Sequence, residues 1–169
     1  MNKFSVGTPF KNVVNIMANT YSQIYLQFVF AVKDRENLIP KEHKEVLHKY
    51  FTGLVQNRKT KMMAVHCMPD HAHLFVNFNP AVLISDFVKE IKVESNELIN
   101  RKKWVSNRFS WQEGYGVFSY SQSHIDSVVK YILNQEKHHQ SKSFRQEYYE
   151  FLRKFEIPFE EKYIFDFIE

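Results

Sequence analysis

Two histidines separated by one residue are the first side chains in this sequence whose spacing could support chemistry. His71 and His73 lie in the run 71–78, which is typical of a β-strand, where side chains alternate between two faces. Both imidazoles therefore share one face, about 6 to 7 Å apart at the backbone because each strand residue rises about 3.3 Å. They could converge on one metal ion, although an arbitrary His-x-His pair is more often an exposed polar face. A third ligand is needed to favour a metal.

A later helix offers a tyrosine and an amide at matching positions. Tyr131 and Gln135 are four residues apart, which is about one helical turn, so both project from the same side of the helix beside its apolar stripe. By themselves they are equally consistent with a half-buried packing residue and a solvated neighbour.

The elements that must position these side chains follow the order β-α-β-β-α-β. Period-two runs predict strands at 22–33, 62–68, 71–78 and 117–120, and apolar residues at three- and four-residue spacing predict helices at 40–56 and 84–101. This order predicts an α+β, ferredoxin-like split β-α-β-β-α-β fold, with an antiparallel sheet, both helices on one face and the other face left free. An added helix at about 123–139, a tail helix at about 143–155 and an aromatic tail follow.

Length and composition limit the class of protein. The 169 residues correspond to about one domain, and 44% hydrophobic residues exclude a disordered chain. A lone cysteine, Cys67, excludes an intramolecular disulfide and a cysteine-rich zinc site, and favours the cytoplasm. No apolar run approaches the length of a membrane span, and residues 1–16 lack the apolar stretch of a signal peptide.

The charge is unevenly distributed. Residues 1–154 carry 22 Lys and Arg against 14 Asp and Glu, a net of +8, whereas residues 155–169 carry one Lys against five acids, a net of −4. A basic body suits a polyanionic partner such as nucleic acid. The basic residues predicted to contact a DNA backbone are Lys89, Lys92, Arg101, Lys102, Lys103 and Arg108. Three glutamates lie in the same stretch of sequence and reduce its positive charge.

Four segments in order resemble one known family. They are ANTYSQIYLQFVFAVKDRENLI, HCMPDHAHLFV, WQEGYGVFSYS and YILNQEKHH. Together they resemble the single-tyrosine HUH transposases of small insertion sequences, the IS200-like family, which cut and rejoin single-stranded DNA. The resemblance begins at about Met17, so residues 1–16 are predicted to be a non-core extension and 17–169 a single domain.

The resemblance implies a role for each candidate residue. His71 and His73 would bind a divalent metal, Gln135 would complete the metal site, and Tyr131 would be the nucleophile. The family implies Mg²⁺ or Mn²⁺, although ligand type alone would equally admit zinc or nickel. It also implies substrates with hairpin ends and a homodimer in which the tyrosine helix of one subunit completes the site of the other.

Several further residues have two readings. His138 and His139 could approach phosphates or the metal, although histidines at such a position are more often exposed at a helix end. His66 and Asp70 could support the strand histidines or only serve the turn. The aromatic residues Trp111, Tyr115 and Tyr120 could stack on bases or belong to the core. For the whole chain, the alternatives are a nucleic-acid-binding module, a metallohydrolase, and a domesticated relative without transposition activity.

Overall fold

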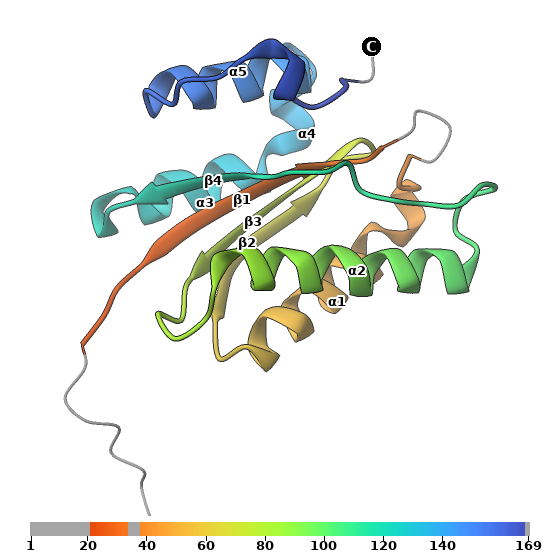
Figure 1. The fold of residues 1–169 in the computed structure, drawn as a ribbon, viewed down its shortest axis with the longest axis horizontal. Helices are drawn as coiled ribbons and strands as arrows, with labels where there is room; N and C mark the ends of the chain where they lie inside the picture. Colours follow the sequence, from red (N-terminus) through yellow and green to blue (C-terminus); the bar gives the residue numbers. More distant parts are fainter. Residues whose placement is uncertain (1–20, 34–37, 168–169) are drawn as a thin grey trace, which may run out of the picture.

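The strands of the computed structural model form one antiparallel sheet. The structure describes residues 21–33 and 38–167, and within them the sheet has four strands in the order β2-β3-β1-β4 (Figure 1). The sheet order and the β-α-β-β-α-β sequence of elements confirm the predicted α+β fold. The strands are β1 (Tyr25–Ala31), β2 (Lys61–Cys67), β3 (His71–Asn77) and β4 (Gly116–Tyr120).

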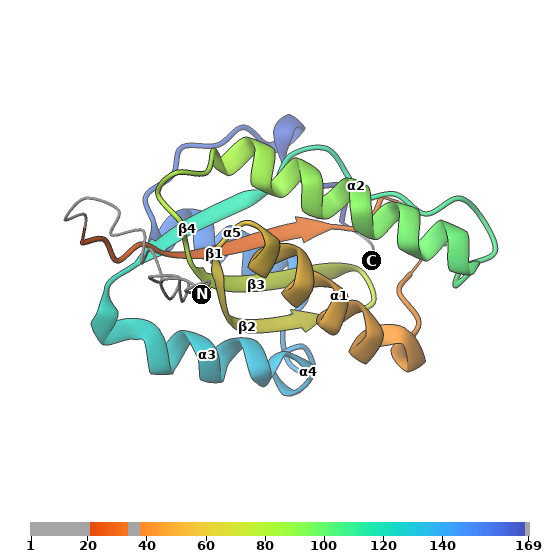
Figure 2. The ribbon, with the colours of Figure 1, turned by 90° about the horizontal axis from the view of Figure 1, so that it is seen from below.

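Two helices cover one face of this sheet. They are α1 (Lys44–Asn57) and α2 (Ile84–Lys102), which lie side by side across the strands in Figure 2. Alternate residues of β3, including Leu74 and Val76, point into the apolar core under these helices. Helix α1 begins later than the predicted residue 40, because Pro40 precedes a 3₁₀ turn.

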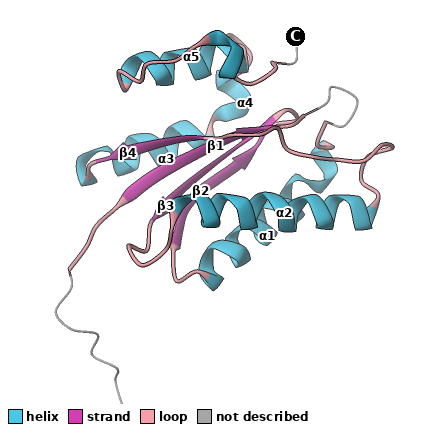
Figure 3. Ribbon diagram, in the orientation of Figure 1, coloured by secondary structure: helices cyan, strands magenta, loops and turns pink. Residues whose placement is uncertain are grey.

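The other face of the sheet, predicted to be left free by the crossover helices, is also covered. Figures 1 and 3 show α3 (Ile125–Leu133), α4 (Gln135–His138) and α5 (Phe144–Lys154) on this side. All seven residues of β1 are therefore buried, since they are covered from both sides. The added C-terminal elements build a second apolar layer, which makes this face an interior surface.

The predicted helix 123–139 is interrupted at Asn134. The backbone of Asn134 leaves helical geometry (φ −99°, ψ 19°), and the Nδ2 atom of Asn134 donates to the carbonyl of Lys130 at 2.8 Å. Asparagine competes with the helical ladder through such local bonds, which is why it ends α3 here. Tyr131 consequently lies on α3, whereas Gln135 begins α4 and is fully buried.

Side-chain hydrogen bonds fix both ends of the C-terminal segment. Ser143 caps α5 in a capping box with Gln146, close to the predicted start at 143. Gln112 then holds the aromatic tail, because its side chain bonds both backbone groups of Asp166, at 2.6 and 2.7 Å. Residues 1–16, the predicted extension, lie outside the described residues. Among the described helices, none is long and apolar enough to cross a membrane.

Candidate active site

Three imidazoles and one carboxylate meet between the sheet and α5. His71 and His73 come from β3, His139 follows α4, and Glu147 lies on α5. The Nε2 atoms of these histidines lie 3.7, 3.4 and 3.3 Å, in that order, from Oε2 of Glu147. The four candidate ligand atoms all lie within 4.8 Å of one another, so they form a single compact cluster.

The strand pattern explains how the first two histidines reach this place. Alternation puts them on the face opposite Leu74, where they are fully buried under the C-terminal helices. The ring of Phe144 stacks on His71, with centroids 4.0 Å apart and planes 5° from parallel. Helix α5 therefore both covers the histidines and brings Glu147 to them.

The second ring nitrogen of each imidazole is held by a polar group. Nδ1 of His71 bonds the carboxylate of Asp70 at 2.7 Å, and Nδ1 of His139 bonds the carbonyl of Lys142 at 2.8 Å. Nδ1 of His73 bonds the amide of Gln27 at 3.0 Å. These contacts fix the ring orientations and direct every Nε2 atom toward Glu147.

His66, the other predicted supporting residue, lies apart from these contacts. Its ring lies 5.6 Å from that of His48, and its Nε2 atom is buried without a hydrogen-bond partner among the described residues. Asp70 is thus the member of the predicted pair that contacts a strand histidine.

Burial lowers the pKa of two histidines of the cluster. Loss of solvent lowers the pKa of His73, with the charge of Glu147 acting in the opposite direction, and burial lowers the pKa of His139 to about 4. Burial alone would raise the pKa of Asp70, but the hydrogen bond and charge of His71 reverse this effect and lower it. His73 and His139 are consequently neutral near pH 7, the form that binds metals.

The cluster fits a divalent cation. Buried polar atoms normally have hydrogen-bond partners, and those left without one need an explanation. Here, apart from Nε2 of His66, the buried side-chain atoms without a partner in the described part of the chain belong to Glu147 and the residues around it, and a cation would satisfy those that face one another. They include Nε2 of His71, His73 and His139, Oε2 of Glu147 and Oε1 of Gln135.

Tyr131 reaches this cluster within the same chain. Its hydroxyl donates to Oε1 of Glu147, and its ring centroid lies 6.3 Å from that of His73. Nε2 of Gln135 donates to the same carboxylate oxygen at 2.9 Å. The structure therefore brings together all four residues predicted from the sequence, with Glu147 between the tyrosine and the histidines.

A surface hollow of about 670 Å³ opens beside the tyrosine. Its lining includes Lys130 and Lys137, both exposed, and the ring of His138, which lies 5.1 Å from that of Tyr131. None of the residues that line this hollow carries a carboxylate. Its two lysines make the approach to the phenol positively charged.

The six basic residues predicted to bind DNA lie elsewhere. Lys89, Lys92, Arg101 and Lys102 belong to α2, and Lys103 is its left-handed C-cap, so the sheet separates this helix from the histidines. Nζ of Lys92 donates to the carbonyls of Gln112 and Gly114 at 2.5 and 2.7 Å, and burial lowers its pKa to about 8. Lys92 thus fixes a loop, while DNA contact by the other members, Arg108 included, stays a prediction.

Of the three aromatic residues that could stack on bases or belong to the core, Trp111 is buried and Tyr120 is half-buried. Trp111 is buried in the core beneath α1 and α2, and its Nε1 donates to Oγ of Ser95 at 2.9 Å. The hydroxyl of Tyr120 donates to Gln27, which in turn contacts His73. Cys67 is buried in the same core as Trp111.

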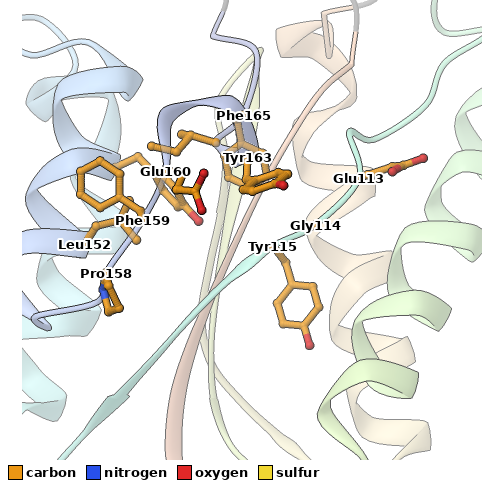
Figure 4. Close-up of a pocket in the computed structure, with 11 residues that line it drawn as sticks. Glu113, Gly114, Tyr115, Leu152, Pro158, Phe159, Glu160, Tyr163 and Phe165 are labelled. Carbon is orange, nitrogen blue, oxygen red and sulfur yellow. The ribbon is translucent and has the colours of Figure 1, made fainter.

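Tyr115 lines a separate pocket of about 440 Å³ beneath the aromatic tail. Figure 4 shows Tyr115, Tyr163 and Phe159 around this space, with Glu160 between Phe159 and Tyr163. Glu113 also lines the pocket. No histidine lines the pocket, and its two carboxylates would repel phosphate. This pocket is therefore separate from the histidine cluster and unsuited to bind a phosphate.

Sequence reasoning missed Glu147 and favoured the exposed reading of His139. A signal for Glu147 exists, because α5 presents Phe144, Tyr148 and Phe151 at helical spacing, and the carboxylate falls on the same apolar side. A buried carboxylate on such a face needs a partner, and that partner here is the cluster.

Fold and site together define a ferredoxin-like domain in which an HxH strand faces a tyrosine. Residues 20–135, more than half of the chain, match the family described as "Transposase IS200 like". The chain belongs to this family of single-tyrosine transposases, which are DNA-cleaving enzymes.

Individual relatives agree with this assignment. The ISDra2 transposase TnpA of Deinococcus radiodurans is 25% identical over 120 residues, which cover 67% of this chain and 84% of that protein. A crystal structure of a Deinococcus radiodurans R1 protein assigned as a transposase has a TM-score of 0.51 at 22% identity, covering 69% of this chain and 94% of that one. A REP-associated tyrosine transposase bound to a REP hairpin has a TM-score of 0.55 at 15% identity, with 71% of each chain covered.

Proposed function

We propose that this transposase cuts and rejoins single-stranded DNA through a covalent 5′-phosphotyrosine at Tyr131. The observation that carries the proposal is the position of the Tyr131 hydroxyl, which bonds Glu147 at the histidine cluster and borders a lysine-lined hollow. A nucleophile beside a cation site and open to a polyanion has what phosphodiester attack requires.

The reaction conserves the energy of the DNA backbone. The phenol oxygen of Tyr131 forms a bond to phosphorus while the bond from phosphorus to the 3′-oxygen breaks, and the phenolic proton is gained overall by the departing 3′-hydroxyl. Because the new phosphotyrosine is again a phosphodiester, a later 3′-hydroxyl can reverse the attack without ATP. Glu147 orients the phenol through its hydrogen bond.

His71, His73 and Gln135 hold the divalent metal in this proposal, and the family resemblance favours Mg²⁺ or Mn²⁺. The partnerless Nε2 atoms of the two histidines and Oε1 of the amide support this assignment. When bound, the cation supplies positive charge that polarises the scissile phosphate.

The DNA strand enters through the hollow beside Tyr131, where Lys130 and Lys137 contact its phosphates. The substrate has hairpin ends, as the family resemblance implies, and the fold neighbour bound to a REP hairpin supports that expectation. Phosphate contacts of this kind position the strand without reading its sequence.

The site works within one chain. The resemblance predicts a homodimer with shared sites, but sharing is unnecessary for assembly, since Tyr131 contacts Glu147 and approaches His73 of its own chain. Dimer formation itself stays a prediction. So does a cytoplasmic location, which the single cysteine, Cys67, supports.

The test is to incubate the protein with labelled single-stranded DNA and Mn²⁺ or Mg²⁺, then separate products by denaturing electrophoresis. A labelled band that migrates with the protein and disappears when metal is chelated is the expected result. Cleavage that yields only free phosphate ends would indicate a metallohydrolase. Binding without cleavage would indicate a nucleic-acid-binding module, and either result would overturn the proposal.

A further inference from the structure

We propose that Glu147 and His139 bind the metal directly, together with His71 and His73, and that this set selects a first-row transition-metal dication over Mg²⁺. The inference rests on the proposed function only in placing a cation at this cluster. It adds two ligands from the segment that follows residues 20–135, the part of the chain that matches the family. The metal site is then complete within one chain.

The size of the cluster supports direct ligation by all four residues. Bonds from such metals to nitrogen or oxygen are about 2.0 to 2.3 Å long, so ligand atoms on opposite sides of an ion lie about 4.0 to 4.6 Å apart. The four candidate atoms lie within 4.8 Å of one another. Only a small contraction of the cluster is needed to surround an ion.

The orientation of the imidazoles supports the same conclusion. Asp70 and the carbonyl of Lys142 accept hydrogen bonds from Nδ1 of His71 and His139, which leaves a lone pair on each Nε2. In the structure, Nε2 of Gln27 faces Nδ1 of His73, and its Oε1 accepts from the hydroxyl of Tyr120. Turning this amide by 180° exchanges its oxygen and nitrogen, and Gln27 then accepts from Nδ1 of His73 in the same way.

The surroundings of Glu147 call for a cation. Its side chain is only 2% exposed, and the groups around its carboxylate are imidazoles, a phenol and an amide, none of which has a fixed positive charge. A buried charge is retained when it is paired or coordinates a metal. Oε1 already accepts bonds from Tyr131 and Gln135, whereas Oε2 has no hydrogen-bond partner and faces the three Nε2 atoms.

Glu147 therefore joins the nucleophile to the metal through its two oxygens. Gln135 contacts the carboxylate of Glu147 and not the cation in this arrangement, since its Nε2 donates to Oε1 of Glu147. In this ligand set Glu147 and His139 replace Gln135 as the ligands beside His71 and His73, and Gln135 positions Glu147 through its hydrogen bond.

The donor types determine which ion is preferred. Mg²⁺ requires oxygen ligands in near-ideal octahedral geometry and retains several of its waters, which suits a site dominated by carboxylates and phosphates. Three imidazole nitrogens with one carboxylate suit the transition metals instead. The family resemblance implies Mg²⁺ or Mn²⁺, and Mn²⁺ is the transition metal of the two, so we choose Mn²⁺ as the probe.

The experiment measures Mn²⁺ binding to the full chain in the absence of DNA, from the loss of the electron paramagnetic resonance signal of free aqueous Mn²⁺. We expect one bound ion, of which less than half is displaced by an approximately hundredfold excess of Mg²⁺. Glu147→Gln and His139→Gln should each weaken Mn²⁺ binding at least about tenfold. The matched controls Glu150→Gln, on the exposed side of α5, and His124→Gln, also exposed, should stay within about twofold of wild type.

A second measurement separates ligand loss from misfolding. The metal-free melting temperature of Glu147→Gln should equal or exceed that of wild type, because the variant removes an uncompensated buried charge. Its Mn²⁺-induced increase in melting temperature should be lost. Unchanged Mn²⁺ affinity in both variants, no binding by wild type, or ready displacement by Mg²⁺ would each overturn the inference.

The inference and the proposed function fail separately. If wild type forms the covalent DNA adduct while Glu147→Gln and His139→Gln bind Mn²⁺ like wild type, only the ligand assignment is wrong. If wild type binds Mn²⁺ as expected but forms no adduct, the ligand assignment stands and the proposed function is wrong.

Discussion

The hydroxyl of Tyr131 donates a hydrogen bond to Oε1 of Glu147, whose other oxygen faces His71, His73 and His139. One carboxylate thus joins the phenol, on α3, to histidines on β3 and beyond α4. Because α5 supplies this carboxylate, the C-terminal segment belongs to the site as much as the HxH strand does.

Replacing Tyr131 by phenylalanine tests the nucleophile directly. The variant loses the reactive oxygen but keeps the ring, which lies against His138 and Phe151. We expect covalent adduct and cleavage to fall at least about a thousandfold, as they do when a nucleophile is removed. The affinity for single-stranded DNA, measured by fluorescence anisotropy, should stay within about twofold. Cleavage at a wild-type rate would exclude Tyr131 as the nucleophile.

Mixing two inactive proteins tests whether the site is built within one chain. Tyr131→Phe protein lacks only the tyrosine, and the double variant His71→Ala, His73→Ala lacks only the histidines. Since Tyr131 approaches His73 of its own chain, every site in a mixed dimer would lack one component, and we expect the mixture to stay inactive. Differently tagged chains recovered together serve as the control for subunit exchange. Cleavage restored by mixing would show that two subunits share each site.

Charge substitutions test where the DNA strand binds. Lys130→Gln and Lys137→Gln remove charges from the hollow beside Tyr131, whereas Lys89→Gln and Lys102→Gln remove them from α2 on the far side of the sheet. Each phosphate contact contributes about 0.7 to the slope of log affinity against log salt for a single strand. We expect each hollow variant to lower that slope by about this amount and each α2 variant to leave it unchanged. If the α2 substitutions lowered the slope more than the hollow substitutions, the DNA would bind at the basic residues of α2 that were predicted from the sequence.

Local periodicity explains why most of the fold and half of the cluster could be predicted. Alternation in 71–78 places His71 and His73 on one face without any knowledge of tertiary structure. The helical repeat likewise places Tyr131 and Gln135 on one side. These regularities depend only on neighbouring residues, so the sequence contains them directly.

The remaining features depend on contacts between distant segments. Glu147 meets His73 across 74 residues (147 − 73), and no repeat encodes that distance. The interruption at Asn134 arises because a side-chain bond to Lys130 competes with the helix, an outcome that propensity alone leaves open. The wrong prediction of a free sheet face has the same origin, since the helices that cover it come last in the chain.

The stability of the protein should depend on pH through His66. Burial, with the nearby charge of Lys44 as a smaller cause, lowers the pKa of His66 to about 4, against about 6.5 in the unfolded chain. Above pH 6.5 both states are neutral and the full stability is present. As pH falls from 6.5 toward 4, the unfolded chain binds the proton first, so the free energy of unfolding decreases, by about 3 kcal/mol at most.

Urea unfolding of metal-free protein between pH 7 and pH 4 measures this effect. His66→Gln should have a smaller pH slope than wild type, while His124→Gln, which changes an exposed ring, should retain the wild-type slope. Equal slopes for wild type and His66→Gln would contradict the prediction.

The close approach of α5 to β4 requires a glycine at position 116. A Cβ atom added to Gly116 would lie 2.9 Å from Cε2 of Tyr148 and 3.0 Å from both its hydroxyl oxygen and Cε2 of Phe118. Tyr148 is buried and directly follows Glu147, so a shift of its ring also displaces the carboxylate. Overpacking of this kind costs about 1 to 3 kcal/mol. We therefore expect Gly116→Ala to lower the free energy of unfolding by about this amount and to weaken Mn²⁺ binding.

Gly53 provides the matched control for this substitution. It lies inside α1, and a Cβ added there would meet nothing within 4 Å. Because alanine is the better helix former, Gly53→Ala should raise the free energy of unfolding by about 0.5 to 1 kcal/mol and leave Mn²⁺ affinity unchanged. Denaturant titrations of the two variants beside wild type measure both expected changes in the free energy of unfolding, the decrease for Gly116→Ala and the increase for Gly53→Ala. If Gly116→Ala were as stable as wild type, α5 would have to pack more loosely on β4 than these distances indicate, and Glu147 would not be held rigidly against the histidines.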